Sequence, residues 1–168
     1  MTPGNATVRV GNGAFGVAVD AAAHAVYVTN NGSGSVAVVD TASRTVAATI
    51  AVGQHPVGVA VDPDAHSAYV TNGDNASLSI IDTTTHAVTG TVPVGMGPTR
   101  VAVDPTAHRV YVTNGDDSSV AVIDTTRHSV IGEAAVGNNP LGVAVDPTTH
   151  IAYVTSDLDH GSISVIEL

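Results

Sequence analysis

The sequence predicts an all-β fold, a β-propeller in which each chain contributes four blades of four antiparallel strands. Three observations lead to this prediction. The 168 residues divide into four copies of a 42-residue unit, each unit contains short Val, Ala, Ile and Thr runs, and turn dipeptides separate the runs. Four strands in a repeat of about 40 residues are typical of a propeller blade. No apolar stripe with a 3.6-residue period is long enough to predict a helix.

The repeat is clearest in the tetrapeptide Tyr-Val-Thr-Asn, which becomes Tyr-Val-Thr-Ser in the last unit. Its four copies begin at Tyr27, Tyr69, Tyr111 and Tyr153. Three further residue types recur at the same step, namely Asp20, Asp62, Asp104 and Asp146; His24, His66, His108 and His150; and Gly11, Gly53, Gly95 and Gly137. The predicted blades span about residues 11–52, 53–94, 95–136 and 137–168, the last completed by residues 5–10. One extra residue lies in the Ser156–Ser162 loop.

The first unit shows how each strand is predicted. Its four strands are expected at Val17–Val19, Ala25–Thr29, Val36–Val39 and Val46–Val52, where β-branched and small residues alternate or run together. Asp20 follows the first strand, and an Asx turn that accepts the next N–H groups is expected there. Pro93 falls in the fourth strand of the unit that spans residues 53–94. A proline there predicts that this strand lies at a sheet edge.

These motifs resemble the YVTN family of bacterial β-propellers, which takes its name from the tetrapeptide at Tyr27–Asn30. The resemblance covers the whole chain and includes the Gly-x-x-Pro-x-Gly-Val-Ala-Val-Asp-Pro segment at Gly53–Pro63. It implies a surface, periplasmic or sensor module. Some related propellers are lyases or lactonases, but this chain has no local motif onto which their catalytic residues can be transferred.

The sequence leaves open how many blades close into one ring. Aligned on the repeat, Ala6–Val10 matches the fourth strand Ala48–Val52, so this N-terminal strand is expected to complete the last blade. Blades meet at about 90° in a ring of four and about 45° in a ring of eight, and the wider wedge needs bulkier side chains to fill it. With one Phe, four Tyr and no Trp, the chain favours a homodimer that forms one eight-bladed ring. A four-bladed monomer and a fragment of a larger ring are the alternatives.

Composition excludes several classes of partner. The chain has 15 acidic and 5 basic residues and a net charge of −10, which argues against nucleic-acid and anionic-membrane binding. The absence of cysteine excludes disulfides and thiolate sites. No apolar run approaches the roughly 20 residues of a membrane span, and residues 1–10 do not resemble a signal peptide. An extracytoplasmic or cell-surface location is favoured, and the compartment stays open.

Candidate ligand-binding residues lie where one unit departs from the others. The turns from fourth to first strand and the loops from second to third strand are expected on one face, at the mouth of the channel. The candidates there are Gln54, His55, Arg100, Asn138 and Asn139. Arg100 stands where the other units have glycine, and its guanidinium could pair with an anion bidentately. Alternatively, it binds backbone carbonyls or a neighbouring Asp.

The recurring His residues are expected to be structural, because one copy per blade spreads them too far apart to share a metal ion. The recurring Tyr residues are likewise expected to pack and form hydrogen bonds within the blades. We therefore expect no cofactor and no metal centre. One secondary candidate is calcium at Asp157 and Asp159, in an oxygen-rich loop. This loop lacks the full ligand series of a calcium site, and a solvated turn explains the same residues.

The function expected from these features is a non-enzymatic binding or protein-interaction scaffold, with an unknown small ligand or protein bound at the channel mouth. No nucleophile elbow, zinc-protease motif or phosphate-binding Gly-Lys motif is present. One alternative is a propeller lyase or lactonase-like enzyme, which needs a metal or a His/Glu cluster at the same mouth. Another is a ligand-free scaffold fragment or an engineered repeat array.

Overall fold

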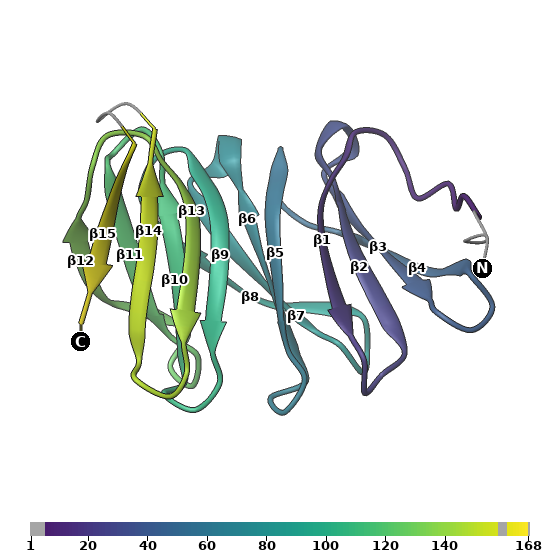
Figure 1. The fold of residues 1–168 in the computed structure, drawn as a ribbon. Helices are drawn as coiled ribbons and strands as arrows, with labels where there is room; N and C mark the ends of the chain where they lie inside the picture. The colour runs from purple at the N-terminus through teal and green to yellow at the C-terminus, as the bar shows by residue number, and fades with distance from the viewer. Residues whose placement is uncertain (1–5, 158–160, 168) are drawn as a thin grey trace, which may run out of the picture.

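The computed structural model describes residues 6–157 and 161–167, which form four antiparallel sheets standing in a row (Figure 1). We call these sheets blades 1 to 4. Blade 1 contains β1 (Ala14–Asp20), β2 (Ala25–Asn30), β3 (Ser35–Asp40) and β4 (Thr45–Ala51), and blade 2 contains β5 (Pro56–Asp62), β6 (Ser67–Asn72), β7 (Ser77–Asp82) and β8 (Ala87–Pro93). Blade 3 contains β9 (Pro98–Asp104), β10 (Arg109–Asn114), β11 (Ser119–Asp124) and β12 (Ser129–Ala135), and blade 4 contains β13 (Pro140–Asp146), β14 (Ile151–Ser156) and β15 (Ser162–Ile166).

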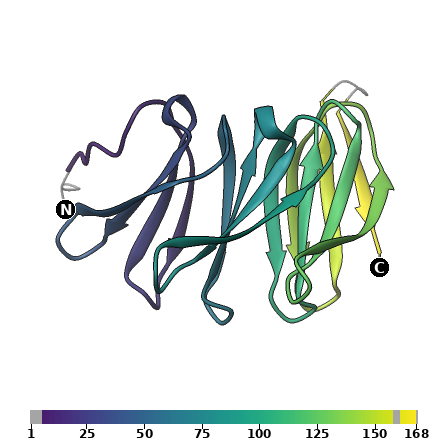
Figure 2. The same ribbon diagram turned by 180° about the vertical axis from the view of Figure 1, so that it is seen from behind.

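The blades form an open row. The first strand of each blade lies beside that of the next, so β1, β5, β9 and β13 stand side by side across Figure 1, whereas Figure 2 shows the opposite side. Blades 1 and 4 lie at opposite ends, so this chain does not form the closed four-bladed ring weighed above. Residues 6–10 are not a strand in the single chain. Whether they complete a last blade therefore stays a prediction.

The local predictions are largely confirmed. Each expected strand is present, and Pro93 ends β8 at the outer edge of blade 2. The Asx turns form as expected, because Asp20 Oδ1 accepts the N–H of Ala23 at 2.9 Å and Asp62 Oδ1 accepts that of Ala65 at 3.1 Å. The described residues contain no α-helix, but two single 3₁₀ turns occupy second-to-third loops at Asn31–Ser33 and Gly73–Asn75. The sequence prediction of no helix missed these turns.

The hydrophobic core lies between blades, in three separate layers. In the first layer, Tyr27 and Val38 of blade 1 pack against Val70 and Ile81 of blade 2. The same positions recur in the next two layers, where Tyr69 and Tyr111 are also buried. Because successive side chains of a strand point to opposite faces, each inner blade contributes to two layers.

A threonine hydroxyl joins each of the first two blades to its neighbour. Thr71 Oγ1 accepts the N–H of Gly58 at 2.7 Å in its own blade and donates to the carbonyl of Thr99 in blade 3 at 3.0 Å. Thr29 does the same between Gly16 and the carbonyl of Val57. The strands come so close here that a Cβ on Gly58 would lie 2.7 Å from the Thr99 carbonyl oxygen. Glycine is therefore required at this position by the neighbouring blade.

Candidate functional site

Two sets of loops form one face of the row, which we call the loop face: the fourth-to-first connections around residues 11–13, 53–55, 95–97 and 137–139, and the second-to-third loops. Backbone hydrogen bonds hold them together in each blade. The N–H of Gly73 donates to the carbonyl of His55 at 2.9 Å, and that of Gly115 donates to Gly97 at 2.8 Å. The predicted placement of both loop types on one face is confirmed.

Backbone geometry explains why His55 and Asn139 occupy their positions. The equivalent residues of the four connections all have a left-handed conformation, with φ of 70° at Gly13, 56° at His55, 63° at Gly97 and 52° at Asn139. This region favours Gly and Asn. The residues that vary at this position must therefore all satisfy the same turn, and His55 is the one histidine among these four.

The side chains near His55 tie neighbouring loops together. His55 Nδ1 lies 3.0 Å from Asp74 Oδ1, and both side chains are more than half exposed. The N–H of Gln54 donates to Asn75 Oδ1. Gln54 and His55 border a hollow of about 460 Å³ with Asn31–Gly34 and Asp74. On blade 4, Asn138 Oδ1 accepts the hydroxyl of Ser118 at 3.3 Å.

Arg100 lies apart from these loops, on the exposed wall formed by the first strands. Its Cζ atom is 5.1 Å from the ring centroid of Phe15, two blades away, a distance that fits a cation–π contact. The equivalent residue of blade 2, which lies between blades 1 and 3, is Gly58, and it has no side chain to separate the guanidinium from the ring. The hollow here is about 220 Å³ and is lined by Phe15, Gly16, Val17, Gly58, Val59, Arg100 and Val101. We call it the wall hollow.

The junction between blades 3 and 4, beside Arg100, has different hydrogen bonds from the first two junctions. Thr113 Oγ1 accepts the Arg100 N–H at 3.0 Å, as its repeat equivalents do. Among the described residues, however, it makes no hydrogen bond to blade 4. It lies 2.8 Å from Thr99 Oγ1, which donates to the Pro140 carbonyl at 3.3 Å. A Cβ stands at position 100, where glycine allows the neighbouring strand to approach in the first two junctions. In this junction the hydroxyl of Thr99 makes the contact with blade 4.

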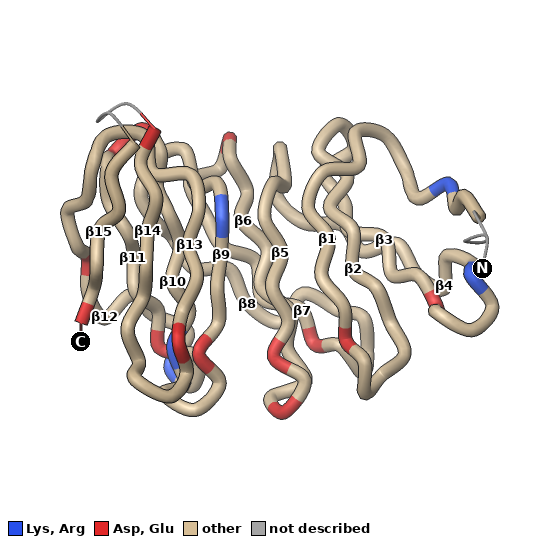
Figure 3. Tube along the Cα trace, in the orientation of Figure 1, with Lys and Arg blue, Asp and Glu red and all other residues tan. Residues whose placement is uncertain are grey.

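The charges around Arg100 are unevenly distributed. Each of β1, β5, β9 and β13 ends in an aspartate, and Figure 3 shows acidic segments at the lower ends of these strands. Arg100 is the third residue of β9 and so lies toward the other end of its strand. Within residues 6–157 and 161–167, Arg100 has no carboxylate partner, unlike Arg127, whose Nη1 lies 2.8 Å from Asp124 Oδ2. Neither of the two alternatives, capture by backbone carbonyls or by an Asp, is found among the described residues.

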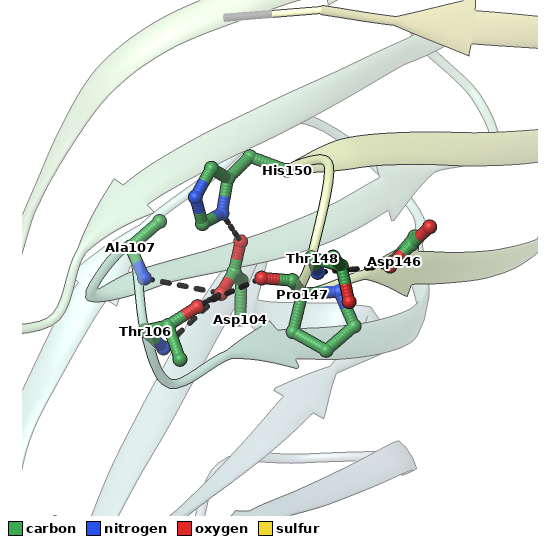
Figure 4. A network of polar contacts seen from close by, with 7 residues as sticks. All are labelled: Asp104, Thr106, Ala107, Asp146, Pro147, Thr148 and His150. Carbon is green, nitrogen blue, oxygen red and sulfur yellow. Dashed lines mark hydrogen bonds and ion pairs between the residues drawn. The ribbon is translucent and has the colours of Figure 1, made fainter.

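At the opposite edge, Asp104 and His150 join blades 3 and 4 (Figure 4). Asp104 is fully buried, and its Oδ2 lies 2.8 Å from His150 Nδ1. Its Oδ1 accepts hydrogen bonds from Thr106 and Ala107. Burial raises the pKa of Asp104, but the hydrogen bonds from His150, Thr106 and Ala107 outweigh it and hold the pKa below its ordinary value. The repeat of Asp and His signalled a turn but did not reveal this contact between blades.

Another hollow, of about 550 Å³, lies between the outer parts of blades 1 and 2. Its lining is uncharged and includes Asn72, Ser77 and Ser79, with Asn72 Nδ2 donating to both serines. Asn72 Oδ1 is buried without a partner among the described residues, and so are the equivalent atoms of Asn30 and Asn114. Because all three units share this feature, we assign it to the repeat.

The sequence-predicted candidates thus occupy three places. Gln54 and His55 border one hollow, Arg100 lines another, and Asn138 and Asn139 stand in the blade 4 connection. Asp157 is exposed and its N–H donates to the Asn139 carbonyl, while Asp159 lies outside the described residues. The described part of the chain contains no group of three His, Asp or Glu residues that could hold a metal ion. It also contains no helix long and apolar enough to span a membrane.

Comparison with solved structures identifies the fold. The hydrazine synthase of Kuenenia stuttgartiensis is 22% identical with a TM-score of 0.86, over 99% of this chain and 49% of that chain. AztD of Citrobacter koseri is 26% identical with a TM-score of 0.59, over 70% and 33%. A candidate 6-phosphogluconolactonase of Bacteroides uniformis is 14% identical with a TM-score of 0.73, over 89% and 51%. No family model and no curated protein sequence matches the chain.

These solved neighbours are β-propellers, so the chain has a propeller fold. It spans about half of the hydrazine synthase and lactonase chains and about a third of AztD. An open row of blades agrees with this proportion.

Proposed function

We propose that this chain is a non-enzymatic binding module of the cell-surface or sensor type that its resemblance to YVTN propellers implies. Its ligand is a small organic carboxylate held in the wall hollow at Arg100. One observation carries the proposal: in a chain of net charge −10, the exposed Arg100 guanidinium has no carboxylate partner among the described residues.

The lining of the wall hollow defines the class of ligand. Arg100 supplies a permanent positive charge with donors that match a carboxylate. Phe15, Val17, Val59 and Val101 supply apolar surface beside it. A carboxylate attached to a small apolar body satisfies both, whereas inorganic phosphate satisfies only the charge. The volume of about 220 Å³ restricts the body to roughly the size of a single ring.

The test is calorimetric titration of the full chain with benzoate and, separately, with inorganic phosphate. We expect benzoate to bind more tightly, and we expect Arg100→Gly to weaken it by at least about tenfold, since a hydrogen-bonded ion pair contributes about 1.5–3 kcal/mol. Arg100→Gly restores the residue found at the equivalent position of the other three blades, so the variant is expected to fold.

Arg44→Gly is the matched control, because Arg44 is an exposed turn residue with φ of 58° that glycine also accommodates. It removes one positive charge far from the wall hollow and should leave benzoate binding unchanged. Equal losses in the two variants would show a general effect of net charge and would overturn the assignment of Arg100. Binding that survives Arg100→Gly would overturn it as well.

A further inference from the structure

The row of blades ends in two exposed apolar faces. On blade 1, the leading face points away from blade 2 and carries Val17 and Val19, which are 65% and 61% exposed. On blade 4, the trailing face points away from blade 3 and carries Tyr153, Ile163 and Val165, which are 39%, 61% and 55% exposed. Contiguous apolar side chains at this exposure mark interaction surfaces.

Each face is a copy of one that is buried inside the chain. Val59 and Val61, the repeat equivalents of Val17 and Val19, are partly buried and pack against the core layer between blades 1 and 2. Tyr111, the equivalent of Tyr153, is fully buried between blades 3 and 4. A trailing face packs on a leading face three times within the chain, so the two uncovered faces are complementary to each other.

The polar contacts of a junction are also half formed at these ends. Thr155 Oγ1 accepts the Gly142 N–H at 3.0 Å, as the threonines of blades 1 and 2 accept their own glycine. Those threonines also donate to the first strand of the next blade, at Val57 and Thr99. The repeat equivalent of these carbonyls on the leading face is that of Phe15. By the same alignment, Asp146 corresponds to Asp104 and His24 to His150.

The trailing face also lacks a strand. In the part of the chain that the structure describes, blade 4 has three strands, and β15 is its outer edge. In blade 1, the fourth strand places Ala48, Ile50 and Val52 in the core layer. Their equivalents are Ala6, Val8 and Val10, in a segment that forms no strand in the single chain. Pairing of this segment with β15 would cover an edge that otherwise invites uncontrolled association.

We infer that a second copy of this chain covers both faces, so that two chains form one eight-bladed ring with a two-fold axis. The leading face of each copy packs on the trailing face of the other, giving two identical junctions. Residues 6–10 of each copy become the fourth strand beside β15 of the other. Thr155 then donates to the partner's Phe15 carbonyl. A second copy supplies an apolar partner to both faces, and it supplies the Phe15 carbonyl and the fourth strand to the trailing face. We therefore choose a second copy over a different protein.

Light scattering on the full chain tests the assembly. The expected mass is twice the chain mass of 16.7 kDa. Val19→Asp and Tyr153→Asp should each give a folded monomer, because burying an unpaired carboxylate at the junction is unfavourable whereas the same residue is exposed in the single chain. Ile131→Asp, at an apolar residue 49% exposed on the outer strand β12, should stay dimeric. A wild-type monomer at 100 μM would overturn the inference.

A disulfide tests the register. Val36 lies opposite Ile50 in blade 1, and the repeat equivalents of this pair are Ile163 and Val8. The chain contains no cysteine, so Val8→Cys with Ile163→Cys should give a covalent dimer on mild oxidation, since directly opposed strand residues lie within disulfide range. Thr7→Cys with Ile163→Cys is the control, because a one-residue shift points the two side chains to opposite faces. Equal cross-linking of both pairs, or none of the first, would overturn the register.

Neither experiment depends on Arg100. If the wild-type chain does not bind benzoate, only the proposed function is overturned. If the wild-type chain is a monomer, only the assembly is overturned.

Discussion

The same repeat position behaves differently inside the row and at its end. Tyr69 and Tyr153 occupy equivalent places in their tetrapeptides, yet Tyr69 is 1% exposed and Tyr153 is 39% exposed. Similarly, Thr71 joins two blades, whereas the hydrogen bond of the Thr155 hydroxyl among the described residues lies within its own blade. In this fold the energetic role of a repeated residue depends on whether another blade lies against it, so equivalent substitutions should have unequal effects.

The largest contrast is expected for the tyrosines. Tyr69→Ala should lower the free energy of unfolding by roughly 3–5 kcal/mol, because it leaves a cavity in the layer between blades 2 and 3. In the Val19→Asp background, where the faces stay uncovered, Tyr153→Ala should cost about 1 kcal/mol or less. Urea unfolding followed by circular dichroism measures both. Equal costs would mean that burial between blades does not control the effect of this tyrosine.

A second contrast concerns glycines. Gly58→Ala should destabilise the chain by roughly 1–3 kcal/mol, since the added Cβ would meet the Thr99 carbonyl at 2.7 Å and Arg100 Cα at 3.1 Å, both backbone atoms. Gly132→Ala on the outer strand β12 is the matched control, because nothing lies within 4 Å of its Cβ position. Gly132→Ala should leave the urea midpoint unchanged or raise it slightly. A drop as large as that of Gly58→Ala would contradict the close approach of the first strands.

The threonine contact should have an intermediate effect. Thr71→Val removes the hydroxyl that accepts the Gly58 N–H and donates to the Thr99 carbonyl, and it leaves both backbone groups without this partner. The expected loss is about 1–3 kcal/mol. Thr155→Val in the Val19→Asp background should cost less, because only the Gly142 N–H loses its acceptor. If the assembly is a ring, the Thr155→Val loss should grow in the otherwise wild-type chain at dimer-forming concentrations.

Sequence patterns predicted the parts of this molecule that local chemistry determines. The alternation of Val and Ala predicted the strands, and Asp before the turns predicted the Asx hydrogen bonds that Asp20 and Asp62 make. The repeat also marked Arg100 as an exception among glycines. It could not show that the guanidinium reaches Phe15 two blades away, because that contact depends on how closely three first strands approach.

The sequence pattern could not predict which of the recurring histidines contacts a neighbouring blade. The recurring histidines have positive φ, 53° at His24 and 61° at His150, so the turn geometry accounts for the position while the side chain remains available. Only His150 among the four contacts a carboxylate through its ring in the described residues, at Asp104. A repeat makes equivalent sites look identical in sequence. The sequence alone therefore could not single out His150 as the histidine that contacts a carboxylate of the neighbouring blade.

The smallest expected effect is a dependence on pH at this junction. The hydrogen-bonded Asp104 has a pKa below its ordinary value, so its stabilising contribution is fully present above the ordinary carboxyl pKa near 4 and is lost as pH falls through the lowered value. His150→Gly removes one cause of the lowering while glycine accommodates φ of 61°. The fall in melting temperature between pH 6 and pH 3 should therefore be about 2–4 °C smaller in this variant, a modest change because His150 is 43% exposed.

His108→Gly is the control. It alters the same turn position at φ of 53°, but the His108 ring makes no hydrogen bond to a carboxylate among the described residues, so this variant should keep the wild-type pH dependence. Differential scanning calorimetry at both pH values measures the three proteins. If His150→Gly and His108→Gly showed the same dependence as the wild type, the contact between Asp104 and His150 would contribute nothing to the acid stability of the junction.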